Sequence, residues 1–142
     1  MLLVDVNVYL YAYWEGAEDH RTYRKWLQDL LVSDEAFGLS ELVLSSFVRI
    51  ATSPRVFSPP ASLKEALAFA DRIRERPNAV PVSPGPRHWE IFKRLCSAAG
   101  AKGNLVADAW LAAMAVESGC EWVTADRDYA RFPGLKTRHP IH

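Results

Sequence analysis

Acidic side chains stand where this sequence is expected to end its buried strands. Asp5 follows the apolar run Leu2–Val4, and Asp126 and Asp128 follow the run Glu121–Thr124. Burying a carboxylate without a partner is costly, so an acid at the end of a core strand needs a reason. Parallel strands with right-handed crossovers end at one edge of a sheet, and ligands bind in the crevice outside that edge. The spacing therefore predicts that these acids share one crevice.

Two further acids are candidates for the same crevice. Glu41 follows the expected second strand, residues 36–39, and stands in the first turn of the next helix. Asp108 is an isolated charge in the otherwise small and apolar helical stretch 105–118. Because that helix precedes the fourth strand and runs antiparallel to it, topology alone leaves the place of Asp108 open.

An all-carboxylate cluster favours a particular chemistry. Like charges repel, so some of these acids would take up protons unless a cation neutralises them. Mg²⁺ and Mn²⁺ prefer oxygen ligands, and the histidines fall on helix or tail segments, which disfavours zinc hydrolase chemistry. The pattern favours metal-assisted phosphoryl transfer. A simpler alternative is that these polar residues cap helices and form turns, which applies to Glu41, Asp128, Asn7 and Thr124.

Strands and helices alternate along the chain. Leu2–Val4, extended in alternation by Val6, Val8 and Leu10, predicts a central strand buried on both faces, with a helix over 8–14. Further strands are expected over 36–39, 79–82 (an edge, because of Pro81), 121–124 and 135–137, with helices between them. Asp19, Ser40 and Ser62 are predicted N-caps and Gly119 a C-terminal glycine. The pattern predicts a doubly wound α/β fold with a mostly parallel sheet.

The overall composition limits the classes of function that this chain can have. The 142 residues fit one domain, residues 1–142, and 49% of them are hydrophobic, as expected of a folded protein. Lys+Arg and Asp+Glu both number 17, so a charge-driven, non-specific nucleic-acid binder is disfavoured. Cys96 and Cys120 lack the spacing of a zinc site and are expected to be small buried side chains. Neither a secretory signal nor a membrane span is indicated, so a cytoplasmic protein is expected.

Three segments together resemble one known family. They are LLVDVNVYLYA at residues 2–12, LVADAWLAAMA at 105–115 and WVTADRDYARFPGL at 122–135. In this order they resemble a PIN-domain ribonuclease, specifically a VapC-type toxin of bacterial toxin–antitoxin modules. The second and third segments are fairly specific together, and neither would suffice alone.

The resemblance implies a three-layer α/β/α sandwich and an endoribonuclease that depends on Mg²⁺ or Mn²⁺ and leaves 5′-phosphate and 3′-hydroxyl ends. It implies that Asp5, Asp108 and Asp126 bind the metal, with Asn7 and Thr124 as supporting polar groups. It also implies a VapB-type antitoxin that places a basic side chain among the acids, an RNA substrate and a homodimer. No membrane partner is expected.

One departure from the family pattern concerns the second acid. In many relatives a glutamate lies inside the helix after the second strand, at the position of Ser46 here. We expect Glu41 to substitute for it, with Asp128 sharing the metal. Four arginines are candidates for steering phosphates, since guanidinium suits bidentate phosphate contacts: Arg49, Arg55, Arg127 and Arg131.

Two other functions stay open at this point. Asp5-Val6-Asn7 is similar to the nucleophile segment of haloacid-dehalogenase-like phosphatases, although that family has a second Asp where Asn7 stands. A non-catalytic PIN-like binding module is the other alternative, because of Ser46. For a protein partner, the early helices offer an aromatic surface suited to a docked helix, formed by Tyr11, Tyr13, Trp14, Tyr23 and Trp26.

Overall fold

A five-stranded, wholly parallel sheet forms the centre of the molecule in a computed structural model that describes residues 1–142. The strand order is β3-β2-β1-β4-β5, so the first strand lies in the middle, as predicted. Its neighbours are the strands that precede Glu41 and Asp126. The strands are β1 (Leu2–Val4), β2 (Phe37–Leu39), β3 (Ala79–Pro81), β4 (Glu121–Val123) and β5 (Thr137–Arg138).

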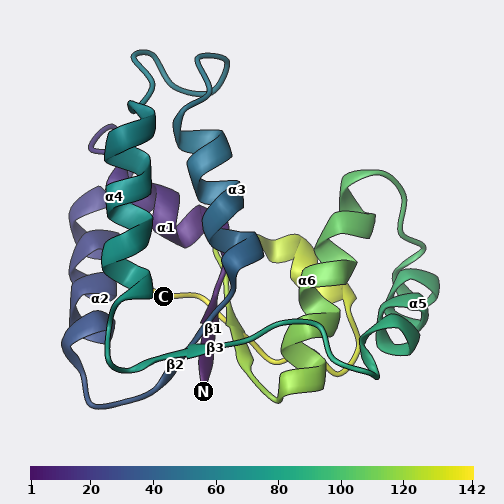
Figure 1. Ribbon diagram of the computed structural model, residues 1–142. Helices are drawn as coiled ribbons and strands as arrows, with labels where there is room; N and C mark the ends of the chain where they lie inside the picture. Colours follow the sequence, from purple (N-terminus) through teal and green to yellow (C-terminus); the bar gives the residue numbers. More distant parts are fainter.

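Helices cover both faces of this sheet. The first four pack with one another on one side, and the last two pair on the other side (Figure 1). This arrangement confirms the predicted α/β/α sandwich. The helices are α1 (Val6–Tyr13), α2 (His20–Val32), α3 (Glu41–Ala51), α4 (Leu63–Arg74), α5 (His88–Ala99), α6 (Asn104–Ser118) and the short 3₁₀ helix η1 (Arg127–Arg131).

The first strand is shorter than its alternation suggested. It ends at Val4 and α1 begins at Val6, so Asp5 alone separates strand from helix. The apolar residues beyond Asp5 belong to a helix whose consecutive residues Val8, Tyr9 and Leu10 are all buried. A helix buried on several sides carries apolar residues at every spacing, including the alternation typical of a strand. The extension of the strand to Leu10 was therefore wrong.

Edge positions of the sheet agree with the prediction from Pro81. Strand β3 is one edge, and its proline lacks the N–H that a central strand would need. The ladder is continued beyond it by Val82, whose N–H donates to the carbonyl of Leu39 at 2.8 Å. The other edge, β5, begins at Thr137, two residues later than expected.

Helix ends follow the predicted caps with one exception. The hydroxyls of Ser40 and Ser62 accept N–H groups from the first turns of α3 and α4, and Gly119 ends α6 with a φ of 71°. Asp19 was expected to cap α2 through its side chain, which makes no such bond. Its backbone is left-handed, with a φ of 58°, and its carbonyl accepts the N–H of Thr22 instead.

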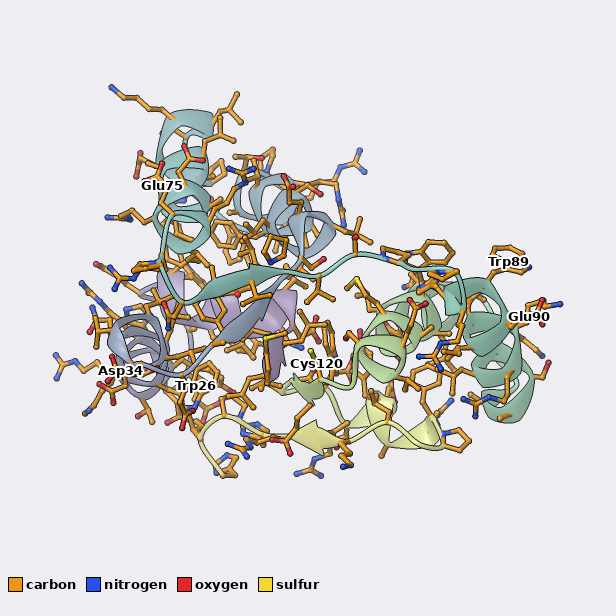
Figure 2. All side chains as sticks on the ribbon, turned by 60° about the horizontal axis from the view of Figure 1, so that its bottom comes forward. Trp26, Asp34, Glu75, Trp89, Glu90 and Cys120 are labelled. Carbon is orange, nitrogen blue, oxygen red and sulfur yellow. The ribbon has the colours of Figure 1, made fainter.

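The core lies on the central strands and the helices against them. Leu3, Phe37 and Trp122 have no exposed surface, and Cys120, directly before β4, is also buried near the middle of the molecule (Figure 2). Cys96 is half-buried, and both cysteines are free. None of the helices combines the length and apolar character needed to cross a membrane.

Candidate active site

Asp5 is held between the first strand and the first helix by three hydrogen bonds. Its Oδ1 accepts the backbone N–H of Val6 at 2.7 Å, which caps α1. Its Oδ2 accepts the hydroxyl of Thr124 at 2.7 Å and the side-chain amide of Asn7 at 3.2 Å. Only 3% of the residue is exposed. The carboxylate is thus fixed in one orientation at the carboxyl end of β1.

Thr124 and Asn7 join the ends of β1 and β4. The Thr124 oxygen accepts the Asn7 amide at 3.3 Å and the backbone N–H of Asp126 at 3.0 Å. The Asn7 carbonyl oxygen accepts the N–H of Ala125 at 3.3 Å. This network fixes the loop that carries Asp126 against the loop that carries Asp5.

Asp126 caps the 3₁₀ helix that follows it. Its Oδ1 accepts the backbone N–H of Asp128 at 2.9 Å, so the capping role that the sequence allowed for Asp128 belongs to Asp126. The Asp128 side chain is exposed and lies 4.0 Å from the Arg131 guanidinium. Asp126 therefore keeps its second carboxylate oxygen available for a ligand.

The third acid reaches the same region from α6. The buried hydroxyl of Tyr129 donates to Asp108 Oδ1 at 3.2 Å, which links α6 to η1. Asp108 is half-buried and its other oxygen has no hydrogen-bond partner within the chain. The sequence did not predict this role for Tyr129. The only indication in the sequence was its position three residues after Asp126, in a turn whose other side chains are mostly charged.

The charges of the three acids act on one another. Burial raises the pKa of Asp5 from 3.8 to about 6, while hydrogen bonds from Thr124 and the Val6 N–H act to lower it. The negative charges of Asp108 and Asp126 raise that pKa further. Three segments distant in sequence thus place carboxylates within electrostatic reach of one another.

The same coupling acts on Asp108 and its tyrosine. Burial raises the pKa of Asp108, the Tyr129 hydroxyl lowers it, and the charges of Asp126 and Asp128 raise it. The pKa of the Tyr129 phenol is raised well above its ordinary value by burial and by the charges of Asp5, Asp108 and Asp126. The phenol therefore stays protonated and donates its hydrogen bond to the Asp108 carboxylate.

The donor set suits a hard divalent cation. The acids offer hard oxygen ligands, and two of them, Asp108 and Asp126, have a carboxylate oxygen without a hydrogen-bond partner. No three Asp, Glu, His or Cys side chains approach closely enough to enclose an ion by themselves. Mg²⁺ commonly uses one or two carboxylates and keeps several of its waters, so the acids fit a partly hydrated ion.

Glu41 is not brought to these acids. It is the first residue of α3, is largely exposed, and its Oε2 lies 3.5 Å from the Arg74 guanidinium at the end of α4. Its charge perturbs neither Asp5 nor Asp108. At the start of α3 this side chain is turned toward α4, so the structure gives the expected substitution no support, and it stays a prediction. Ser46, at the position of the family glutamate, is half-buried farther along α3.

The arginines predicted to steer phosphates lie on the surface in two places, two of them in the short helix that Asp126 caps and two at the end of α3 and just after it. Arg131 is engaged by Asp128, and the others form no ion pair or side-chain hydrogen bond. All four are exposed: Arg49 in the last turn of α3, Arg55 in the loop after it, and Arg127 and Arg131 in η1.

Comparison with known proteins agrees with the fold. The sequence profile of the PIN domain matches residues 2–135. The chain is 44% identical to the VapC ribonuclease Mb2897 of Mycobacterium bovis over 141 residues, 99% of this chain and 96% of that one. It is 42% identical to ribonuclease VapC25 of Mycobacterium tuberculosis over 140 residues, 99% of both chains.

Solved structures show the same fold at low identity. VapBC-1 from nontypeable Haemophilus influenzae superposes with a TM-score of 0.71 at 13% identity, covering 99% of this chain and 98% of that one. VapBC2 from Rickettsia felis, bound to a DNA fragment from its promoter, gives 0.67 at 18% identity and covers 96% of each chain. These relatives do not favour a haloacid-dehalogenase-like phosphatase. The chain belongs to the PIN-domain family and, within it, to the VapC proteins.

Proposed function

We propose that this protein is a toxin of a toxin–antitoxin module that cuts RNA with the help of Mg²⁺ or Mn²⁺. The observation that carries the proposal is the hydrogen-bond network that gathers Asp5, Asp108 and Asp126 at the carboxyl edge of the sheet: Thr124 joins Asp5 to the Asp126 loop, and Tyr129, in the turn that Asp126 caps, holds Asp108. The ribonuclease names of relatives that match nearly the whole chain support the same reaction.

Asp108 and Asp126 would hold a partly hydrated ion through their free oxygens, and Asp5 would accept a hydrogen bond from one of its waters at the remaining acceptor position of its carboxylate. An ionised carboxylate offers about four acceptor positions, and Asp5 uses three of them on Val6, Asn7 and Thr124. A bound divalent ion supplies hydroxide at neutral pH and offsets charge on the scissile phosphate. The chain's own part is to hold the acids rigidly and to keep Asp5 charged through the Thr124 hydroxyl.

Cleavage of a single-stranded RNA tests this assignment. The protein should cut in Mn²⁺ or Mg²⁺, stop in a chelator, and leave 5′-phosphate and 3′-hydroxyl ends. Asp126→Asn should remove cleavage, whereas Asp34→Asn, an exposed acid on the turn before β2, should cut like the wild type. Metal-independent cutting, or full activity of Asp126→Asn, would overturn the proposal. Calorimetry with Mn²⁺ separates a non-catalytic module, which would bind no ion at this site.

An antitoxin helix has a place to dock on the early helices. Residues of α1, α2 and α4 line a groove of about 360 Å³, with Tyr13, Leu27 and Phe69 on its walls and Arg24 and Arg72 at its rim. A second hollow of about 580 Å³ adjoins it. We propose that an apolar antitoxin helix lies here, and the VapBC structures that share this fold support the proposal.

The aromatic residues expected on this surface divide into two groups. Tyr13 and Trp14 line the second hollow, and Trp14 is 42% exposed. Tyr23 is buried and supports Tyr11 edge to face at 5.2 Å, while Trp26 is half-buried. Tyr13→Glu should abolish capture of the antitoxin while RNA cleavage persists. The proposed homodimer is tested separately by sedimentation of the free toxin.

A further inference from the structure

The hydroxyl of Tyr129 is the only protein group that holds the carboxylate of Asp108. The bond runs from Tyr129 Oη to Asp108 Oδ1 at 3.2 Å and joins residues 21 positions apart in the chain. Asp108 lies in the second turn of α6, inside the helix, so no helix-end N–H is available to it. Its orientation therefore depends on this phenol.

The ring of Tyr129 is itself rigidly placed. It is 2% exposed and packs against Trp122 of β4 and Phe132, with ring centroids 5.4 Å and 5.9 Å away. A buried aromatic ring in contact on both sides has little rotamer freedom. The hydroxyl is thus a fixed reference point at the edge of the sheet.

Tyr129 also belongs to the turn that Asp126 caps. Asp126 accepts the N–H at the start of η1, and Tyr129 lies within that same short helix. One segment therefore supplies the Asp126 carboxylate and the hydroxyl that orients the Asp108 carboxylate. A movement of this turn would move both groups together, so the Asp126 and Asp108 carboxylates would keep their relative positions.

We propose that Tyr129 is a positioning residue that orients Asp108, turning its free oxygen toward a divalent ion shared with Asp126. This inference rests on the proposed metal-dependent function. Removing a group that orients a metal ligand costs about 10–100-fold in metal affinity or activity in proteins where it has been measured. The ring of Tyr129 packs in the core, and its hydroxyl holds the Asp108 carboxylate.

Tyr129→Phe tests the hydroxyl because it keeps the ring. We expect the half-saturating Mn²⁺ concentration to rise about 10-fold, measured by calorimetry and by electron paramagnetic resonance of free Mn²⁺. RNA cleavage should fall at limiting Mn²⁺ and recover at saturating Mn²⁺. Tyr9→Phe is the matched control: that phenol is equally buried at 2% exposure, but only burial, and no carboxylate, perturbs its pKa. It should leave Mn²⁺ affinity unchanged.

A double-mutant cycle separates positioning from a general loss of structure. If Tyr129 acts through Asp108, then Tyr129→Phe should have no further effect on Mn²⁺ affinity in an Asp108→Asn background. Equal Mn²⁺ affinity of Tyr129→Phe and the wild type would overturn the inference while leaving the proposed function intact. An additive effect in the Asp108→Asn background would overturn it as well. Failure of the wild type to bind Mn²⁺ and cut RNA would instead overturn the proposed function.

Discussion

Asp5→Asn should make the protein more stable at neutral and alkaline pH while removing its activity. The wild-type carboxylate is buried, and its pKa of about 6 in the folded protein exceeds the ordinary value of 3.8. The folded state therefore binds more protons than the unfolded state between these values, and stability falls as the pH rises through this window. Above this pH window the buried charge lowers the free energy of unfolding by a constant amount, and asparagine, which has no charge, avoids this loss.

The size of the effect follows from the shift. About two pKa units at about 1.4 kcal/mol each give a cost of about 3 kcal/mol for charging Asp5. Asparagine keeps an oxygen for the Val6 N–H but turns an NH₂ group toward the donors Thr124 and Asn7. That mismatch costs about 1–2 kcal/mol. The net gain at about pH 8 is then about 1–2 kcal/mol, or about 3–6 °C in Tm for a chain of this length.

Denaturant unfolding in a chelator, at about pH 8 and about pH 4, measures this directly. At the lower pH Asp5 is largely protonated, the charge cost is gone, and only the mismatch remains. Asp5→Asn should then be less stable than the wild type by about 1–2 kcal/mol, so the sign of the difference reverses. A difference that is the same at both pH values would refute the reasoning, because a buried, destabilising charge cannot act equally when it is neutral.

Three further outcomes follow from the same geometry. Thr124→Val should move the acidic limb of the pH–rate profile to higher pH, because the Thr124 hydroxyl lowers the pKa of Asp5. A pH–rate profile that matches the wild type would contradict this role. Glu41→Gln should keep kcat/KM for RNA within about twofold of the wild type and the free energy of unfolding within about 0.5 kcal/mol, because the ion pair of Glu41 with Arg74 is exposed. A large loss of activity would show that Glu41 takes part in the site. Adding Mn²⁺ should raise the Tm of the wild type but not that of Asp126→Asn, as a scan with and without chelator will show.

Local patterns revealed most of the fold because each rested on nearby residues. The run Leu2–Val4 identified the central strand, and Pro81 identified an edge. The first strand was predicted too long because Val6, Val8 and Leu10 are apolar at every second position. They belong instead to a helix that is buried on several sides and is therefore apolar at most positions. A period of two and a buried helix cannot be told apart over so few residues.

The candidate site was predictable only as far as topology reaches. Asp5 and Asp126 follow strands, and parallel strands end at one edge, so their meeting was implied by position alone. The bond between Tyr129 and Asp108 depends on how α6 sits over η1, which no spacing encodes. Glu41 also follows a strand, but the direction of its side chain toward Arg74 is a matter of helix rotation. Position along the chain predicts the edge a residue reaches, and packing decides where it points.

The central place of β1 bears on how the protein is made. The hydroxyl that holds Asp5 Oδ2 belongs to Thr124, which is synthesised 119 residues after Asp5. Strand β4, which flanks β1 and supplies that hydroxyl, lies in the last quarter of the chain. A nascent chain therefore cannot assemble the acidic crevice until β4 and the loop that carries Asp126 have also been synthesised.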